Sequence, residues 1–304
     1  MTTVVSTFAG SAPDQRQERR LIMPMLRVNG TKLYYEDTGG SGPAILFTHG
    51  LFWDSSLFAP QIAALKSRYR CVAYDHRGQG QSAASDLRAI DMDTLFADAV
   101  ALIEALELEP VHVCGLSMGG FVAMRLGARR PDLVRSLLLL DTSADPEPPE
   151  NTLKYRLWNW IARILGVGSL IDETMLMFGK SALSDPARAA ERDAWRRQLR
   201  SNRRSLWRAV NGAIERPSVY HELSRITAPT LVMVGEEDTV TVPAKAERIA
   251  AAIAGAQLVR IPRAGHMVTL EQPQAVTQAI GGFLDGLGYC AGSSRHGTGL
   301  LATG

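Results

Sequence analysis

A serine lies between two glycines in the segment GLSMG (115–119). The segment fits the pattern G-x-S-x-G, with an apolar run over 111–115 before it and helical spacing over 118–129 after it. A sharp strand-to-helix turn needs glycine on both sides of its central residue and holds that side chain clear of the sheet. The free N–H groups of the following helix can stabilise an oxyanion. The pattern therefore indicates nucleophilic catalysis by Ser117, although the same five residues also occur in loops without chemistry.

A serine hydroxyl is a weak nucleophile near neutral pH, so it needs a general base, and the base needs an orienting acid. In the strand–turn–helix context of this motif, the expected chain order is serine, acid, histidine. Asp238 follows the apolar run TLVMVG (230–235), and His266 follows the run AQLVRIP (256–262). Sites in open parallel sheets form at the carboxyl ends of strands. We therefore expect Ser117, Asp238 and His266 to form a catalytic triad.

Other side chains compete for the acid and base roles. Asp141, at the end of the run over 134–141, is the first alternative acid, and Glu236 and Glu237 adjoin Asp238. The remaining histidines fit the base role less well, because they lie inside a strand-like run, precede the serine or fall late in a helical or terminal stretch: His49, His76, His112, His221 and His296. We expect His49 and His76 to hold loops by hydrogen bonds.

The elements that must position these residues alternate between strand-like and helical patterns. A hairpin with the turn Asn29-Gly30 comes first. Further strand-like runs lie at 44–50, 71–75, 111–115, 134–141, 230–235 and 256–262, with helical spacing over 57–69, 92–108, 118–129, 243–254 and 273–285. Short Val-, Ile- and Leu-rich runs separated by helices are typical of a parallel sheet covered on both faces. The predicted fold class is α/β.

One stretch, 144–225, lacks strand-like runs. The segment PEPPEN (146–151) opens it, and its helical segments hold four of the five tryptophans, at 158, 160, 195 and 207. We expect an inserted helical cap whose tryptophans mostly fill its own core. Arginines between 192 and 208 spread around a helix beside acidic residues, which favours a solvated face over a nucleic-acid site.

Composition and net charge limit the classes of function that this chain can have. The chain has 304 residues, of which 46% are hydrophobic and 21% charged, enough apolar material for a large core. The net charge of +2 predicts no bulk attraction to nucleic acid or anionic lipid. Without an apolar run near 18 residues or a secretory signal, no membrane insertion is expected and a cytoplasmic location is the default. Three scattered cysteines, Cys71, Cys114 and Cys290, favour neither a disulfide framework nor a metal site.

Five motifs in order, FTHGLFWD (47–54), YDHRGQGQS (74–82), GLSMGG (115–120), GEEDTVTVP (235–243) and AGHMVTLEQP (264–273), resemble the α/β-hydrolase fold superfamily. The resemblance covers about residues 25–285. It implies a mostly parallel eight-stranded sheet with helices on both faces and a helical cap inserted after the sixth strand. The implied nucleophile is Ser117, the acid Asp238 and the base His266, and the implied oxyanion donors are the backbone N–H groups of Leu51 and Met118.

The domain organisation that follows has five parts. The α/β-hydrolase core covers 25–143 and 226–285, the helical cap covers 144–225, and a flexible N-terminal arm (1–24) and C-terminal tail (286–304) complete the chain.

A serine at 117, where epoxide- and halide-processing members of the superfamily use a carboxylate, favours acyl transfer. The chain is similar to small carboxylesterases, to 3-oxoadipate enol-lactonases and to cofactor-free perhydrolases. We predict a serine hydrolase that cleaves carboxylic esters of short to medium acyl chains through an acyl-enzyme, without a metal or organic cofactor. Enol-lactone hydrolysis, perhydrolysis and a ligand receptor without turnover are the alternatives.

The expected partner is a small-molecule ester or lactone. Apolar side chains, Leu51, Phe52, Trp53, Met118, Trp158 and Trp160, are expected to line its pocket. Exposed apolar surface on the cap leaves a homodimer open.

Overall fold

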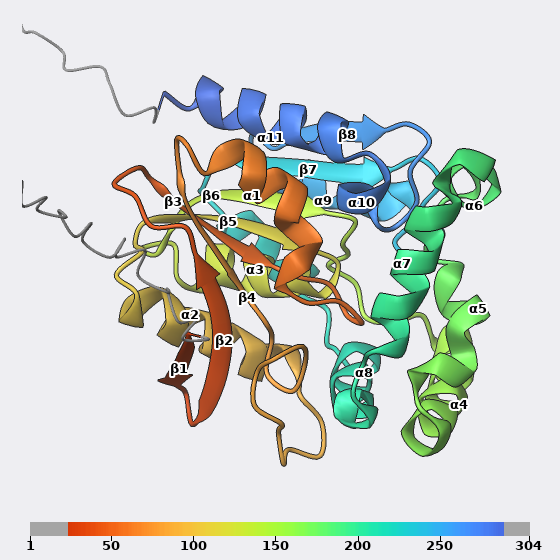
Figure 1. The fold of residues 1–304 in the computed structure, drawn as a ribbon. Coiled ribbons are helices and arrows are strands. Elements are labelled where there is room, and N and C mark those ends of the chain that lie inside the picture. The colour runs from red at the N-terminus through yellow and green to blue at the C-terminus, as the bar shows by residue number, and fades with distance from the viewer. Residues whose placement is uncertain (1–23, 289–304) are drawn as a thin grey trace, which may run out of the picture.

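The computed structural model describes residues 24–288, whose strands form one eight-stranded sheet in the order β1-β2-β4-β3-β5-β6-β7-β8 (Figure 1). The strands are β1 (Met25–Val28), β2 (Thr31–Asp37), β3 (Ala44–Thr48), β4 (Arg70–Tyr74), β5 (Val111–Leu116), β6 (Val134–Leu140), β7 (Thr230–Gly235) and β8 (Gln257–Ile261). Two pairings are antiparallel, β1 with β2 and β2 with β4, and the pairings along the rest of the order, from β4 to β8, are parallel. The predicted fold class, a mostly parallel eight-stranded sheet, is confirmed.

The hairpin between β1 and β2 turns at the predicted pair. Asn29 has φ 43° and Gly30 has φ 71°, the left-handed backbone that a two-residue hairpin turn requires and that asparagine and glycine tolerate best. The turn places the antiparallel ribbon at the edge of the sheet beside β4.

Helices cover both faces of the sheet. On one face α1 (Ala59–Leu65) packs against α11 (Pro273–Gly286), and on the other α2 (Met92–Ala105) packs beside α3 (Met118–Arg129), with α9 (Pro243–Ala252) against β7 and β8. Side chains of successive strand residues alternate between two buried apolar clusters, one under each helical layer. This burial on both faces explains why the central strands read as continuous apolar runs.

The helices between β6 and β7 form one group beyond the carboxyl ends of the strands, at the right of Figure 1. They are α4 (Pro149–Leu165), α5 (Ile171–Met175), α6 (Lys180–Ser184), α7 (Ala189–Arg200) and α8 (Trp207–Ile214), and the short α10 (Val268–Glu271) follows β8. Short 3₁₀ helices lie at Ser55–Phe58, Val167–Leu170, Pro186–Arg188, Arg204–Leu206 and Tyr220–Arg225.

This helical group shares a core with the sheet. Trp195 of α7 stacks on Phe178 with 4.2 Å between ring centroids and 8° between planes. Phe178 in turn meets the ring of Trp53, in the loop after β3, at 6.2 Å. Trp195 and Leu199 belong to the same buried cluster as sheet residues of β5, β6 and β7. The helical group is therefore anchored to the sheet by buried aromatic contacts.

Among residues 24–288, no helix combines the length and apolar character that crossing a lipid bilayer requires. Cys71 and Cys114 are buried free thiols, and Cys290 lies outside the described residues. The predicted arm and tail also fall outside them, except Pro24 and residues 286–288. Gly286 is the last residue of α11 rather than the start of a tail, because Leu287 and Gly288 still donate to the carbonyls of Leu284 and Asp285.

Candidate active site

Ser117 occupies a strained turn between β5 and α3. Its φ of 53° and ψ of −112° lie in a region that residues other than glycine rarely adopt. A Cβ atom on Gly119 would clash with the carbonyl oxygen of Thr48, and one on Gly115 would clash with that of Gly119. The two glycines thus let the turn close tightly against β3, which leaves the Ser117 side chain at the carboxyl end of the sheet.

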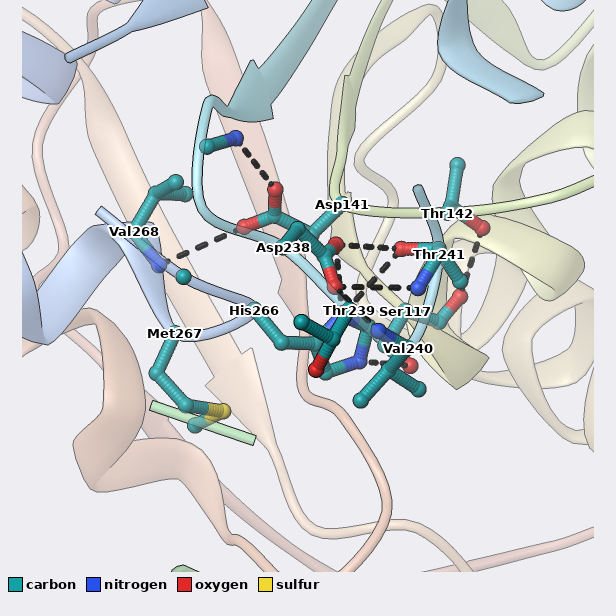
Figure 2. Close-up of polar contacts among 12 residues, drawn as sticks. Ser117, Asp141, Thr142, Asp238, Thr239, Val240, Thr241, His266, Met267 and Val268 are labelled. Atoms are coloured by element: carbon teal, nitrogen blue, oxygen red, sulfur yellow. Dashed lines mark hydrogen bonds and ion pairs between the residues drawn. The ribbon is translucent and has the colours of Figure 1, made fainter. Parts of the chain in front are cut away.

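Three side chains from three strand ends meet at this point (Figure 2). The Nε2 atom of His266 lies 2.8 Å from the Oγ of Ser117, and its Nδ1 lies 2.9 Å from the Oδ2 of Asp238. His266 and Asp238 are buried, with 4% and 3% of their surfaces exposed. The carboxylate of Asp238 favours the proton on Nδ1, which leaves Nε2 to accept the hydrogen bond from the serine hydroxyl.

Asp238 is held by the loop that follows β7. Its Oδ1 accepts hydrogen bonds from the backbone N–H groups of Val240 (2.7 Å) and Thr241 (2.9 Å), and its Oδ2 accepts from the Thr241 hydroxyl at 2.6 Å. Burial opposes ionisation of this carboxyl. The neighbouring His266 and the hydrogen bonds from His266 and Thr241 nevertheless hold its pKa below the ordinary value. The group is therefore a carboxylate at neutral pH.

The loop that carries His266 is anchored on one buried carboxylate. Glu271 accepts hydrogen bonds from the N–H groups of Gly265 (3.0 Å) and Met267 (3.1 Å), the two neighbours of His266, and from Gly179 (2.8 Å). The N–H of His266 itself donates to the carbonyl of Met177 at 2.8 Å. Burial raises the pKa of Glu271, and the three N–H donors oppose that rise. Glu271 thus fixes the backbone on both sides of the histidine.

The alternative acids lie elsewhere. Asp141 is fully buried, and it accepts from the N–H groups of Gly235 (2.8 Å) and Val268 (3.3 Å) without contacting His266. Burial and then the charge of Asp238 raise the pKa of Asp141 well above its ordinary value. Glu236 is exposed, and Glu237 accepts hydrogen bonds from Ser181. Of the described residues with a carboxylate, only Asp238 contacts the imidazole of His266.

The histidines expected to hold loops do so. The Nε2 of His49 accepts from the N–H of His76 at 2.9 Å, and the Nε2 of His76 lies 3.0 Å from the Thr48 hydroxyl and 3.1 Å from the carbonyl of His49. Both rings are fully buried, and burial lowers the pKa of each. They brace the loops after β3 and β4 behind the site.

Two backbone N–H groups lie beside Ser117 without an acceptor in the described part of the chain. One belongs to Met118, the first residue of α3, and the other to Leu51. A Cβ built on Gly50 would lie 3.5 Å from the Cβ of Ser117, so the loop that carries Leu51 runs directly past the serine. Phe52, with φ 70°, turns this loop, and its carbonyl accepts from Asn202 at 2.9 Å. The two N–H groups can therefore meet an oxygen that carries negative charge.

A cavity of about 350 Å³ opens above Ser117 between the sheet and the helical group. Of the six predicted apolar residues, Leu51, Phe52, Met118 and Trp158 line it, and the prediction for Trp53 and Trp160 is wrong. Trp53 is only 4% exposed and packs in the core against Phe178. Trp160 is 59% exposed, because two residues along α4 rotate a side chain about 200° away from Trp158.

Several residues that the sequence analysis did not assign to the site take part in it. Trp207 and Phe121 line the cavity, Thr241 holds Asp238, and Glu271 holds the His266 loop. Thr241 follows Asp238 by three residues, a spacing at which the aspartate side chain commonly accepts from nearby backbone N–H groups. That spacing is a usable signal, whereas nothing local in the sequence points to Trp207 or Glu271.

Comparison with known proteins places this geometry in a family. A family profile described as "Alpha/beta hydrolase family" matches residues 45–279. Among characterised relatives, 3-oxoadipate enol-lactonase 1 of Acinetobacter baylyi is 28% identical over 250 residues, which cover 80% of this chain and 89% of that protein.

Solved structures with the same fold include an esterase and a lactonase. A thermophilic esterase from Thermogutta terrifontis superposes with a TM-score of 0.80 at 30% identity, covering 87% of this chain and 99% of the esterase. The enol-lactonase from Burkholderia xenovorans LB400 also gives a TM-score of 0.80 at 30% identity, covering 86% of this chain and all of the lactonase (100%).

Proposed function

The chain belongs to the alpha/beta hydrolase family, and from this premise we propose that it is a serine hydrolase of carboxylic esters with short to medium acyl chains. Ser117 is the nucleophile, His266 the general base and Asp238 the orienting acid. The observation that carries the proposal is the continuous chain of contacts from Ser117 Oγ to His266 Nε2 and from His266 Nδ1 to Asp238 Oδ2.

The proposed reaction has two halves. His266 accepts the proton of the Ser117 hydroxyl as the Oγ attacks the ester carbonyl, and it then donates that proton to the departing alkoxide. In the second half His266 takes a proton from water, which attacks the acyl-enzyme carbonyl, and Ser117 regains its proton as the carboxylic acid leaves. Asp238 keeps the imidazole in the required tautomer and stabilises its charged form.

The N–H groups of Leu51 and Met118 are the proposed oxyanion hole. Both are fixed by the backbone before the substrate binds, so they stabilise the negative charge of each tetrahedral intermediate without reorganising. Loss of one such donor costs about 3–4 kcal/mol of transition-state stabilisation in serine hydrolases.

The cavity supports the proposed substrate class. Its lining includes the apolar side chains of Leu51, Phe52, Met118 and Trp158, and its volume of about 350 Å³ suits an acyl chain of modest length. We further propose that residues 144–225 act as a cap, because α4 and α8 contribute side chains to the wall opposite Ser117. Core segments 25–143 and 226–285 then carry the triad.

Lactone hydrolysis on the same triad is the second candidate. It is favoured by the similarity to the two enol-lactonases, one in sequence and one in structure. A lactone differs from an ester only in that the departing alkoxide stays attached to the acyl group, so the same residues serve both reactions.

Ester turnover and covalent labelling test the proposed function together. We expect the protein to hydrolyse p-nitrophenyl butyrate and to gain the mass of a fluorophosphonate on the peptide that contains Ser117. Ser117→Ala should abolish labelling and lower kcat by several orders of magnitude, with an unchanged circular dichroism spectrum. Labelling without sustained turnover would indicate a ligand receptor. Near-native turnover by Ser117→Ala would overturn the assignment.

A further inference from the structure

Helix α4 has a row of large apolar side chains on its exposed face. This outer stripe consists of Leu153, Leu157, Trp160 and Ile164, whose exposed fractions run from 47% for Ile164 to 79% for Leu153. Steps of four, three and four residues align the side chains along one side of the helix, over about 16 Å. A single exposed leucine is ordinary, whereas a continuous apolar row indicates a surface that binds a partner.

The opposite face of α4 forms a wall of the cavity above Ser117. Tyr155, Trp158 and Ala162 line the cavity, and their positions on the helix lie roughly opposite the outer stripe. The helix lies at the outer edge of the helical group (Figure 1). Because a helix with its side chains is about 10 Å across, the thickness of α4 alone separates the outer stripe from the cavity.

The opening of the cavity is also apolar. Leu176 and Val240 line the cavity and are exposed as well, by 63% and 42%, so they stand where it meets the surface. An apolar molecule that arrives at this opening therefore meets apolar side chains on its way to Ser117.

Basic side chains lie along both margins of the outer stripe. Arg156 and Arg163 follow one margin and Lys154 lies on the other, and all three are exposed. Arg156 contacts Glu215 at 3.5 Å, an exposed ion pair of the weak kind, while Lys154 and Arg163 have no carboxylate partner among the described residues. The one acidic residue of α4 is Glu150, in its first turn. The outer stripe is thus an apolar row between two positive margins.

These charges discriminate between partners. A second copy of the chain seated on the outer stripe would bring a basic margin against a basic margin, whether the two helices ran parallel or antiparallel, so like charges would oppose the pairing. Four side chains are also few beside the roughly 20–30 residues that each side of a stable protein interface supplies. An anionic lipid surface suits both features, since apolar side chains enter the acyl region while lysine and arginine heads reach the phosphates.

We propose that α4 binds an anionic lipid surface and lies in the plane of the headgroups, with the outer stripe against the acyl chains. Trp160 lies in the row, and tryptophan is the side chain that membrane interfaces favour. The net charge of the whole chain is only +2, so the attraction is local to α4. An ester dissolved in the lipid then lies about one helix diameter from the cavity. The delivery of that ester rests on the proposed function, whereas the binding of lipid does not.

Vesicle sedimentation tests the binding, with the full-length protein and vesicles of phosphatidylcholine alone or of equimolar phosphatidylcholine and phosphatidylglycerol. We expect binding to the anionic vesicles, about fivefold or more weaker binding to phosphatidylcholine alone, and release as salt screens the basic margins. The double variant Leu157→Ser/Trp160→Ser should lower the partition coefficient about tenfold, because it removes apolar contact with the acyl chains. Leu87→Ser alters an exposed leucine outside α4 and is the matched control, which should bind like the wild type.

Tryptophan fluorescence tests which face touches the lipid. Of the five tryptophans Trp160 is the exposed one, so its indole leaves water on binding and the emission should shift to shorter wavelength. Trp160→Phe keeps an aromatic ring in the outer stripe, so it should still bind but lose most of that shift. A full shift in Trp160→Phe would mean that another surface contacts the vesicle, and the proposal would be wrong.

Turnover connects the lipid surface to the site. The substrates are p-nitrophenyl decanoate carried in the anionic vesicles and p-nitrophenyl butyrate in solution. Leu157→Ser/Trp160→Ser should lower the rate on the vesicle-borne ester about fivefold and leave the rate on the soluble ester unchanged.

Two results overturn the lipid proposal. One is equal binding of the wild type and Leu157→Ser/Trp160→Ser to anionic vesicles. The other is a dimer in analytical ultracentrifugation that the double variant abolishes, with no vesicle binding by the wild type, since a second copy then covers the outer stripe. Vesicle binding without turnover of either ester would instead overturn the proposed hydrolase function and leave the lipid surface in place.

Discussion

At the scale of single residues, the site depends on which carboxylate faces His266. Asp238→Asn replaces the acceptor at Nδ1 by an amide, which favours the wrong histidine tautomer, so kcat should fall by about 10⁴-fold. The pKa of Asp238 lies below the ordinary value for an aspartate, so the wild-type carboxyl group is ionised throughout the neutral and alkaline range. We therefore expect the same deficit from about pH 6 to about pH 9 in a pH–rate profile.

Asp141→Asn is the matched control for this prediction. Asp141 is as buried as Asp238, but among the described residues its carboxyl group accepts only from the N–H groups of Gly235 and Val268. We expect this variant to lose stability and to retain most of its kcat. If Asp238→Asn kept the native kcat and Asp141→Asn lost it, Asp141 and not Asp238 would be the orienting acid.

The triad residues could be predicted from the sequence, whereas the tryptophans that line the cavity could not. Ser117, Asp238 and His266 could be located because each follows an apolar run, and a parallel sheet brings such positions to one edge. The choice among tryptophans could not be made. Which face of α4 turns inward depends on its packing against α8, where Asn159 bonds to Trp207 and Asn211, and no spacing within α4 encodes that partner.

At the scale of elements, Glu271 ties the His266 loop to the segment before α6. Glu271→Gln would turn an amide N–H₂ either toward the N–H of Met267, which now donates to Oε1, or toward those of Gly179 and Gly265, which both donate to Oε2. We expect the free energy of unfolding to fall by about 2 kcal/mol. Because the imidazole then loses its fixed position, kcat should fall on the order of tenfold with little change in KM.

Steady-state kinetics and urea unfolding check the Glu271 prediction, with Glu236→Gln as the control. Glu236 is an exposed carboxylate at the same sheet edge, and its variant should match the wild type in both measurements. A Glu271→Gln protein with reduced stability but native kcat would restrict Glu271 to a purely structural role.

The ends of helices could be predicted from the sequence only where a capping residue or a proline marks them. Helix α2 begins at Met92, where the expected range starts, and the side chain of its N-cap Asp91 accepts from the N–H of Thr94. The helix predicted over 57–69 is shorter than expected. It begins as a 3₁₀ turn capped by Asp54 and becomes α1 only at Ala59, where Pro60 fits because the first turn needs no donor. The expected helix over 92–108 ends at Ala105, since Glu107 adopts φ 51°.

At the scale of the whole molecule, the proposed cap and the core should unfold together. Trp195 of α7 is 6% exposed, stacks on Phe178 and lies in the same buried cluster as strand residues of the sheet. Trp195→Ala leaves a cavity between the two parts, so we expect the free energy of unfolding to fall by about 3–5 kcal/mol. Trp160→Ala, on the exposed face of α4, should change it by no more than about 0.5 kcal/mol.

Urea unfolding followed by far-ultraviolet circular dichroism and by tryptophan fluorescence distinguishes one cooperative unit from two. Most tryptophans lie in the helical group, so fluorescence reports mainly on the proposed cap, while circular dichroism reports on every element. Coincident transitions in the wild type and in Trp195→Ala are expected, because a shared core couples the two parts. A fluorescence transition that precedes the dichroism transition would mean that the cap melts alone, and the buried contacts of α7 would then not bind it to the sheet.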